Sequence, residues 1–451
     1  MFVNNFYCVE LPYQNDATHY YAALADLPGT VWLDSGGMAR HDILTAIPQR
    51  TLILDDAATA GVDPFEWLRS ELGKPVELAV DVPFAGGALG YWSYDLARRM
   101  VAVPSIAEGA KQLPLMAVGI YDWALVLDHH QRTARLVSQQ RFAGTAALLP
   151  DVLARLKNLR PLAHNDFNVS GKLRSNFTRA GYAKAFAAVQ HYLRSGDCYQ
   201  INLAQRISAT ASGDALNAYL TLRQLSPAPY SAFLNFPHAQ ILCASPERFL
   251  RVKNGKVVTR PIKGTRPRSR DAQQDIELAG ELRNHPKDRA ENLMIVDLLR
   301  NDLGKSCVPG SVHVPELFVV ESFADVHHLV STVEGVLAGG RDALDVLRDC
   351  FPGGSVTGAP KLRAMQIIEE LEPNRRGIYC GVIGYIGFDG NMDTNIAIRT
   401  LVYNHAEIHC WVGGGIVADS EEAAEYQETL YKAKAMLNLL QHYGGQYDAF
   451  A

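Results

Sequence analysis

Four acidic side chains occur in two pairs at helical spacing, an arrangement that could bind a divalent cation. Asp288 and Glu291 lie three residues apart, as do Glu425 and Glu428, so each pair occupies one face of a helix. Taken alone, such pairs are typical of a solvated surface. The apolar run LMIVDLL after Glu291 and the tyrosines around Glu428 instead predict partial burial. Buried carboxylates need a cation or hydrogen-bond donors, and hard divalent cations prefer oxygen ligands.

A lysine in an apolar, strand-like segment is the second candidate for chemistry. Lys263 stands in the string PIKGT. Burial would lower its pKa and make its amine a nucleophile, whereas composition alone favours a strand lysine whose amine reaches solvent. The Asn254-Gly255 turn predicts a hairpin between ILCASPERFLRV and KVVTRPIKG, which brings Glu247 into the same neighbourhood.

Two further motifs support less chemistry. His327 and His328 are adjacent in a predicted strand, so one of them faces inward. A hydrogen-bonded histidine of the core is the default interpretation of that residue, and a general acid is the alternative. FPGGSVTGAPK has the GxxxxG spacing from Gly353 to Gly358, but Pro360 removes a backbone N–H and no Gly-Lys-Ser/Thr follows. We therefore predict no nucleotide site.

Four helices in the second half of the chain would position these residues. Apolar residues at helical spacing from Tyr182 onward predict the first, which Gly196 ends. The second runs over residues 286–304, between a proline and a glycine. Pro360 suits the first position of the third, and Ser420 is a good N-cap for the last.

The remaining pattern is rich in strands. CYQINLAQRI alternates, which places Gln200, Asn202 and Ala204 on one face that we predict to be polar and open. The chain has no internal repeat, low-complexity tract or heptad seam, which excludes solenoids and coiled coils. An α+β fold is the class that remains.

Composition excludes several other classes of protein. The 451 residues are 48% apolar and 20% charged, which is typical of a globular chain with a sizeable core. A net charge of −5 gives no global attraction to nucleic acid or to an anionic membrane. Seven scattered cysteines without a CxxC pair indicate a reducing compartment. No Lys or Arg precedes Arg40, and no apolar run approaches a membrane span, so we predict a cytoplasmic protein.

A series of long strings between Phe177 and Leu440 resembles the chorismate-utilising enzymes, in the family's order and spacing. The strings are PIKGT, AENLMIVDLLRNDLG, HHLVSTVEG, FPGGSVTGAPKLRAM, YCGVIGYIG, NIAIRTL, VGGGIVADS and EYQETLYKAKAML. VWLDSG and PFAGGALGYWSYD resemble weaker N-terminal motifs of the family. The resemblance implies two packed antiparallel β-sheets with helices outside and the active site in the cleft. It implies an N-terminal α+β region over residues 1–160 and a catalytic region over residues 172–443, both parts of one compact unit.

Two positions relate the chain to particular branches of that family. Anthranilate synthases usually read PIAGT and aminodeoxychorismate synthases PIKGT, so Lys263 makes the chain similar to the second branch. Salicylate and isochorismate synthases carry a lysine where this chain has Gln200, which argues against activation of a water molecule here.

The resemblance also implies a reaction and assigns residues to it. Chorismate would be aminated at ring carbon 4, with Lys263 attacking ring carbon 2, Glu247 protonating the departing hydroxyl, and ammonia then displacing the lysine. Mg²⁺ would be held by Glu291 and Glu428, supported by Asp288 and Glu425. His328 is implied as a third catalytic residue near the substrate, and the substrate-binding positions implied are Gln200, Ser355, Tyr379, Arg399, Gly415 and Lys432. The anthranilate branch usually has threonine at the position of Ser355.

Partners and alternatives follow from the same resemblance. No glutaminase sequence is present, so we expect a separate glutamine amidotransferase subunit, and a separate lyase that removes pyruvate. The segment that ends at Ser35 resembles one that lines a tryptophan pocket in relatives. One alternative is anthranilate synthase component I, against which Lys263 argues. Another is a non-catalytic tryptophan-binding subunit, which would be expected to lose Lys263, Glu247 or a metal carboxylate.

Overall fold

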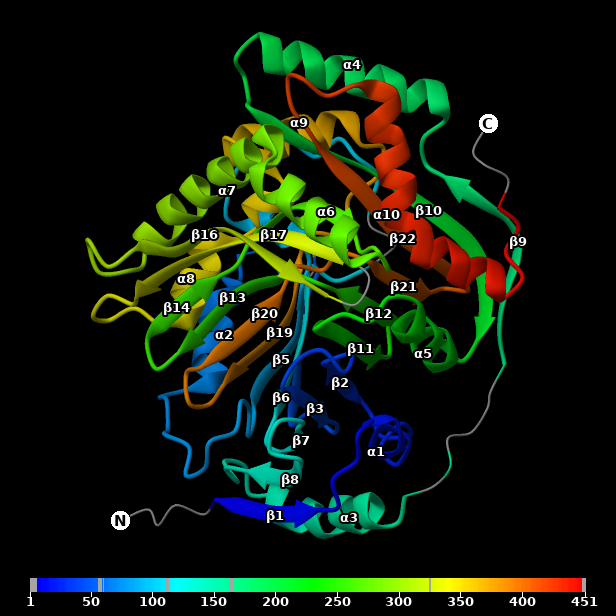
Figure 1. Cartoon of the computed structure of the whole chain (residues 1–451). Coiled ribbons are helices and arrows are strands. Elements are labelled where there is room, and N and C mark those ends of the chain that lie inside the picture. The colour runs from blue at the N-terminus through cyan, green and yellow to red at the C-terminus, as the bar shows by residue number, and fades with distance from the viewer. Residues whose placement is uncertain are drawn as a thin grey trace.

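Two antiparallel β-sheets form the centre of the molecule, and helices cover their outer sides (Figure 1). The computed structural model describes residues 6–447 except 56–58, 60, 110–112, 160, 162–165 and 324–325. Within that part of the chain, every ladder between named strands is antiparallel, including the long pairs that build the middle of each sheet. This architecture confirms the α+β class expected from the sequence.

The first sheet contains twelve strands in the described part of the chain. Their order across the sheet is β1 (Tyr7–Leu11), β8 (Thr133–Ser138), β7 (Ala124–Asp128), β3 (His41–Thr45), β2 (Val31–Asp34), β11 (Tyr230–Phe236), β12 (Ala239–Ser245), β21 (Thr400–Asn404), β22 (Glu407–Ile416), β10 (Gln200–Gly213) and β18 (Gly358–Ala359), with β9 (Phe167–Ser175) also paired to β10.

The second sheet contains ten strands among the described residues. Their order is β15 (Ile262–Pro267), β17 (Val326–Val336), β14 (Lys256–Thr259), β13 (Arg248–Lys253), β20 (Met392–Asn395), β19 (Val382–Gly387), β5 (Gly87–Trp92), β6 (Met116–Tyr121) and β4 (Arg50–Leu54), with β16 (His313–Ser322) also paired to β17.

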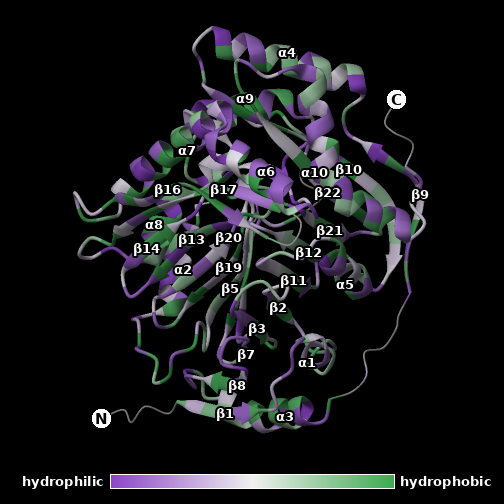
Figure 2. Cartoon of the chain, viewed as in Figure 1, coloured by the Kyte–Doolittle hydropathy of each residue, from purple (hydrophilic) through white to green (hydrophobic). Residues whose placement is uncertain are grey.

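The helices lie between groups of strands along the chain, and Figure 2 shows that hydrophilic and hydrophobic residues are interspersed along them. They are α1 (Thr18–Ala22), α2 (Pro64–Leu72), α3 (Thr145–Lys157), α4 (Arg179–Arg194), α5 (Ala215–Leu225), α6 (Ala272–Asn284), α7 (Pro286–Gly304), α8 (Ala343–Cys350), α9 (Lys361–Leu371) and α10 (Glu422–His442), with 3₁₀ turns η1 (Tyr94–Arg99) and η2 (Gly354–Val356). Within the described ranges, no helix is both long and apolar enough to cross a bilayer.

Both sheets take strands from residues 1–160 and from residues 172–443. In the first sheet β2 pairs with β11, so that Trp32 lies opposite Phe233. In the second, β5 pairs with β19, and Gly90 lies opposite Gly384. A Cβ atom on Gly384 would lie only 2.2 Å from the carbonyl oxygen of Asp393, so the recurring glycines of β19 allow close strand packing.

Three local expectations from the sequence need correction. The Asn254-Gly255 turn joins β13 to β14 in a hairpin as predicted, but the first strand of that hairpin begins at Arg248, because the chain changes sheets between β12 and β13, at Ser245-Pro246-Glu247. The polar face of β10 is not open to solvent, because Gln200 and Asn202 are both buried. Ser420 does not cap α10, since the N-cap is Glu421 and the Ser420 hydroxyl donates to the carboxylate of Glu425.

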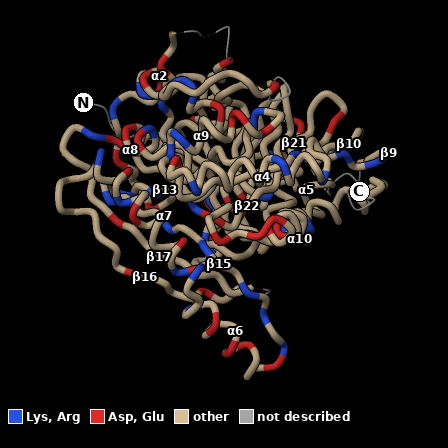
Figure 3. Tube along the Cα trace, turned by 90° about the horizontal axis from the view of Figure 1, so that it is seen from above, with Lys and Arg blue, Asp and Glu red and all other residues tan. Residues whose placement is uncertain are grey.

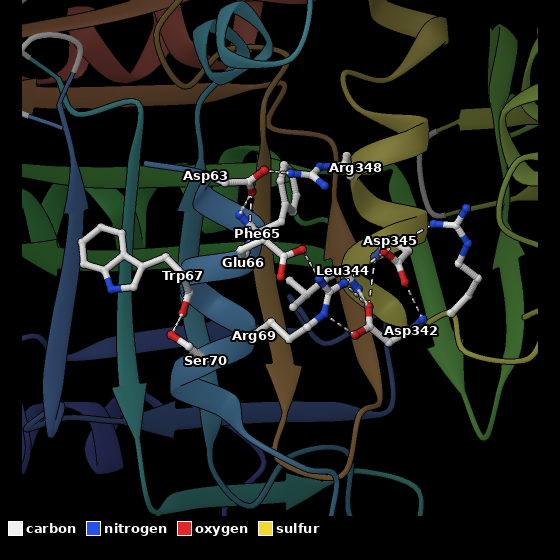
Figure 4. A network of polar contacts seen from close by, with 11 residues as sticks. Asp63, Phe65, Glu66, Trp67, Arg69, Ser70, Asp342, Leu344, Asp345 and Arg348 are labelled. Atoms are coloured by element: carbon white, nitrogen blue, oxygen red, sulfur yellow. Dashed lines mark hydrogen bonds and ion pairs between the residues drawn. The ribbon is translucent and has the colours of Figure 1, made fainter. Parts of the chain in front are cut away.

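Helices α2 and α8 are joined by ion pairs between the cap of one and the last turn of the other (Figure 4). Asp63 caps α2 and pairs with Arg348 near the end of α8. Asp342 caps α8 and accepts from Arg69 of α2, with 2.9 Å between Arg69 Nε and Asp342 Oδ2. This network (Asp63, Arg348, Asp342 and Arg69) joins the first half of the chain to α8, which leads directly into the turn that carries Ser355.

Candidate active site

A cavity of about 770 Å³ opens where the edges of the two sheets meet α7 and α10. It is lined by all the residues proposed from the sequence as site residues except Gln200 and Ser35. The predicted residues that line it are Glu247, Lys263, Asp288, Glu291, His328, Ser355, Tyr379, Arg399, Gly415, Glu425, Glu428 and Lys432. We refer to this cavity as the active-site cleft.

Lys263 and Glu247 lie together in the cleft, although β13 and β14 separate them along the chain. Lys263 belongs to the edge strand β15, and Glu247 lies in the crossing between the sheets. Burial raises the pKa of Glu247 to about 7, although Lys263 and a hydrogen bond from Ser355 act to lower it. Burial lowers the pKa of Lys263, and Glu291 opposes that shift. Both shifts favour the uncharged forms.

The hydroxyl of Ser355 donates to Glu247 Oε1 over 3.1 Å. Ser355 lies in η2, immediately after the end of α8. This contact links the 354–356 turn to the carboxyl group that faces Lys263 in the cleft. Ser355 is therefore placed to hold Glu247 in one orientation.

The four carboxylates predicted from the sequence meet at one end of the cleft. Asp288 and Glu291 come from α7, and Glu425 and Glu428 come from α10. A Cβ atom on Gly414 would lie 3.1 Å from Glu425 Oε2 and 4.0 Å from Glu428 Oε1, so these two oxygens border the space that the glycine leaves. Burial raises the pKa of Glu291 and Glu425, and the neighbouring carboxylates raise them further. Such repulsion favours a bound cation.

Two lysines currently neutralise part of this cluster. Lys432 pairs with Glu428 over 2.6 Å, and this pair lowers the pKa of Glu428 although burial acts to raise it. Lys287 lies 4.0 Å from Glu291 Oε1 and 3.8 Å from Glu425 Oε1. With the side chains in these positions, no three His, Cys, Asp or Glu side chains of the described ranges converge as metal ligands. Lys287 was not predicted, although its spacing of four residues before Glu291 is a recognisable signal.

Asp288 is the carboxylate most occupied by other partners. It accepts a hydrogen bond from Arg266 over 3.2 Å, and its Oδ2 lies 3.0 Å from His285 Nδ1, which itself accepts the backbone N–H of Asp288 over 3.3 Å. These contacts tie the first turn of α7 to β15. Figure 3 shows α6, which follows β15, projecting from the body of the molecule with acidic residues along it.

Arg399 and Tyr379 also supply polar groups to the cleft. Arg399 has a backbone φ of 49°, in the left-handed region that L-residues rarely occupy. Its side chain has no carboxylate within ion-pair distance among the described residues, and burial lowers its pKa. Tyr379 stacks on Trp411, with ring centroids 6.2 Å apart. Arg399 is partly buried, and a guanidinium in such a position without a carboxylate partner is suited to an anionic ligand.

Gln200 does not line the cleft and lies behind the backbone of Gly415, which does. A Cβ atom on Gly415 would lie 3.1 Å from Gln200 Cδ, so the amide packs against the glycine backbone that faces the cavity. Neither amide atom of Gln200 has a hydrogen-bond partner among the described residues.

The two adjacent histidines point to different environments. His328 lines the cleft, and its Nδ1 lies 2.9 Å from Thr265 Oγ1. Burial, and next the Arg399 charge, lower the pKa of His328 to about 4. It is therefore neutral at pH 7, when it can accept or donate one hydrogen bond but is not a charged acid. His327 instead contacts Ser322 and Asp275 outside the cleft.

A second cavity, of about 290 Å³, lies between the N-terminal strands and the second sheet. Leu33, Asp34, Tyr230 and Tyr385 are among its lining residues. Ser35, predicted for this pocket, is buried beside it, where its backbone N–H donates to Asp42 Oδ1 over 2.7 Å.

The fold and the cleft place this chain in a defined class of proteins. A family model described as chorismate binding enzyme matches residues 29–438, and the chain belongs to that family. It is 49% identical over 449 residues to "Aminodeoxychorismate synthase component 1" of Escherichia coli (strain K12), which covers 95% of this chain and 97% of that protein. It is 40% identical over 423 residues to "Anthranilate synthase component 1" of Streptomyces coelicolor, covering 89% of this chain and 81% of that protein.

A solved structure has the same architecture. The crystal structure of anthranilate synthase component I from Streptococcus pneumoniae TIGR4 matches with a TM-score of 0.80 and 34% identity, over 88% of this chain and 92% of that one. That protein and this chain therefore share their fold over most of their lengths.

Proposed function

We propose that this chain aminates chorismate at ring carbon 4 to give 4-amino-4-deoxychorismate, a step toward p-aminobenzoate and folate. The relatives that share 46–49% identity are named aminodeoxychorismate synthase component 1, while the anthranilate synthases are more distant. The observation that carries the proposal is the pair of Lys263 and Glu247 in the cleft, because this pair combines a nucleophile with an acid.

Lys263 and Glu247 would perform the first half of the reaction. The neutral amine of Lys263 forms a bond to ring carbon 2, both conjugated ring double bonds shift, and the bond from carbon 4 to its hydroxyl oxygen breaks. Glu247 gives its proton to that oxygen, which leaves as water. A carboxyl group with a pKa of about 7 holds such a proton at neutral pH far better than an ordinary glutamic acid.

Ammonia completes the reaction. It attacks carbon 4, the bond between carbon 2 and Lys263 breaks, and the carboxylate of Glu247 takes a proton from the new ammonium group. The balance is chorismate plus ammonia giving 4-amino-4-deoxychorismate plus water, with both side chains restored. Arg399, Tyr379 and the Gly415 backbone would hold the pyruvyl side chain, since all three line the cleft.

The carboxylate cluster fits a magnesium ion by its chemistry, since carboxylate oxygens are suitable ligands and the carboxylates raise one another's pKa. Glu291 and Glu428 would hold Mg²⁺, with Asp288 and Glu425 in support. When bound, the ion would supply positive charge for the ring carboxylate of chorismate. Lys287 and Lys432 would give up their present contacts with these carboxylates.

The name "component 1" of the relatives implies a second component. We propose that it is a glutamine amidotransferase that supplies ammonia to the cleft, and that a separate lyase removes pyruvate. The free, scattered cysteines agree with a reducing, cytoplasmic location.

The second cavity is proposed to bind tryptophan. Its walls combine aromatic rings (Tyr230 and Tyr385) with charged side chains, including the Arg248–Asp393 pair joined by two contacts of 2.9 Å. These groups suit an indole ring and an amino-acid head group. Bound tryptophan would raise the melting temperature by mass action. A melt that does not change on adding tryptophan, in protein shown to contain none, would contradict this proposal.

One incubation tests the function. The purified chain is mixed with chorismate, Mg²⁺ and an ammonium salt, and the product is identified by mass spectrometry. We expect 4-amino-4-deoxychorismate with ammonium, and with glutamine only after the partner subunit is added. Anthranilate as the main product would favour the other branch of the family, and glutamine-dependent turnover by the chain alone would contradict the need for a partner.

A further inference from the structure

A buried ion pair lies directly behind the wall of the active-site cleft. Arg376 is 2% exposed and Glu372 is 3% exposed. Arg376 Nε donates to Glu372 Oε2 over 2.9 Å, and Arg376 Nη2 donates to Glu372 Oε1 over 2.6 Å. Neither residue lines the cleft. Burying two charges costs more than an average ion pair returns, so the remaining contacts of this pair need an explanation.

Those contacts are to the backbone of segments that do line the cleft. Arg376 Nη1 donates to the carbonyl oxygen of Val356 over 2.9 Å, and Nη2 also donates to the carbonyl oxygen of Asn202 over 2.6 Å. Glu372 Oε1 accepts the N–H of Ala204 over 2.9 Å. One planar guanidinium therefore joins β10, the 354–356 turn and the end of α9, which are remote from one another in the sequence.

Each joined segment carries a group already placed at the substrate. Val356 follows Ser355, whose hydroxyl donates to Glu247. Asn202 lies opposite Gly415 in the β10–β22 ladder. The third group is on the segment of Arg376 itself, because the N–H of Tyr379 donates to the Arg376 carbonyl oxygen.

We propose that Arg376 is a positioning residue for chorismate: its guanidinium fixes the wall of the cleft that carries Ser355, Gly415 and Tyr379. The fork geometry matters as well as the charge, because three acceptors at different angles are held by one rigid group. A lysine has one compact ammonium group and cannot reach Glu372, Val356 and Asn202 in the same geometry. A misplacement of 1 Å in a cleft wall can cost roughly 10² in rate.

The test compares Arg376→Lys with wild type, using the full chain with chorismate, Mg²⁺ and ammonium. We expect kcat/KM to fall by roughly 10², chiefly through a higher KM for chorismate. KM does not depend on how much of the enzyme is folded, so a raised KM separates positioning from a loss of stability. The matched control is Arg98→Lys, because Arg98 forms a buried pair with Glu369 and does not line the cleft. This control should lose stability and keep the wild-type KM.

A double variant covers the case in which Arg376→Lys does not fold. Arg376→Met with Glu372→Leu removes both charges together, which avoids leaving one buried charge unpaired. We expect it to melt cooperatively and still to show a raised KM. A wild-type KM in the folded variants, with only the melting temperature lowered, would overturn the proposal.

The inference rests on the proposed function, because the KM measured is that for chorismate. Hydrogen exchange separates the two. Peptides that cover residues 200–204 and 354–357 should exchange faster in Arg376→Lys than in the Arg98→Lys control, whatever the substrate. If the wild-type protein did not convert chorismate, only the proposed function would be refuted. If hydrogen exchange were unchanged in both peptides, the positioning role of Arg376 would be refuted.

Discussion

In the proposed mechanism, the acid that assists departure of the hydroxyl must be protonated when chorismate arrives. Burial raises the pKa of Glu247 from 4.5 to about 7. At pH 7 about half of such groups carry a proton, compared with about 0.3% for a carboxyl group at the ordinary value. The shift corresponds to roughly 3 kcal/mol of preference for the neutral form. The cleft therefore holds a usable acid at neutral pH.

The pH profile of amination checks this argument. The protonated fraction of Glu247 falls by up to tenfold per pH unit above pH 7, and we expect kcat/KM to show this loss of the proton as one limb of its pH profile. Protonation of the Lys263 amine should lower kcat/KM in the other limb, so that the profile is bell-shaped. Its two apparent pKa values then describe Lys263 and Glu247 together and not either residue alone. Ammonium is adjusted at each pH to keep the concentration of free ammonia constant, because otherwise the titration of ammonia would hide the limb.

Two variants test whether Glu247 is responsible for its expected limb of the pH profile of kcat/KM. Glu247→Gln cannot donate a proton and should lower kcat by about 10² to 10⁴, with the limb lost. Ser355→Ala removes a hydrogen bond that favours the charged carboxylate, so the limb should move to higher pH. A wild-type rate in Glu247→Gln, or a flat wild-type profile through pH 7, would refute the reasoning.

The same shift predicts a gain in stability for Glu247→Gln. The folded pKa lies above the unfolded value, so the stability that this group contributes is complete below pH 4.5 and is lost as the pH rises through about 7. Glutamine does not titrate. The variant should therefore melt at a higher temperature than wild type at pH 8, and the difference should shrink as the pH is lowered. An equal difference at all pH values would mean that burial of charge is not its cause.

Three further perturbations probe other parts of the site and fold. Lys263→Ala should slow amination strongly without abolishing it, since ammonia can attack directly. Mass spectrometry of wild type trapped with a chorismate analogue should find an adduct on the peptide that contains Lys263. A wild-type rate in the variant, with no adduct on wild type, would exclude covalent catalysis. Glu291→Gln and Glu428→Gln should each weaken Mg²⁺ and chorismate binding together in calorimetry, and unchanged Mg²⁺ binding in both would point to other ligands. Arg69→Ala breaks the partly exposed pair with Asp342 and should cost about 1 kcal/mol of unfolding free energy with no change in KM for chorismate, whereas a raised KM would extend the site to α2.

Local signals in the sequence predicted the helices of the site well. Helix α7 begins at Pro286 and ends at Gly304, as the proline and glycine indicated. The three-residue spacing then placed Asp288 and Glu291 on one face, and both line the cleft. Such features depend on neighbours within one or two turns, which periodicity detects.

Features that depend on distant partners were not predictable in this way. The chain crosses from one sheet to the other at Pro246, and only the pairing of β12 with β21 and of β13 with β20 determines that crossing. Gln200 and Asn202 alternate as expected, but whether their face is open depends on what packs against β10. Arg376 was missed because nothing within a turn of it indicates that its acceptors lie near residues 202 and 356.

Burial shifts the pKa values of Lys263 and Glu247 in opposite directions, which would allow one cleft to hold the proposed nucleophile and the proposed acid side by side. In water the amine would be charged and the carboxyl ionised, so neither would be reactive. Desolvation lowers the first pKa and raises the second, while the attraction between the charged forms opposes both shifts. Net reactivity therefore requires desolvation to outweigh that attraction. The carboxylates around Glu291 also favour a charged Lys263. A cation bound among those carboxylates would cancel their effect, which gives metal binding a second consequence: it would release the lysine as a nucleophile.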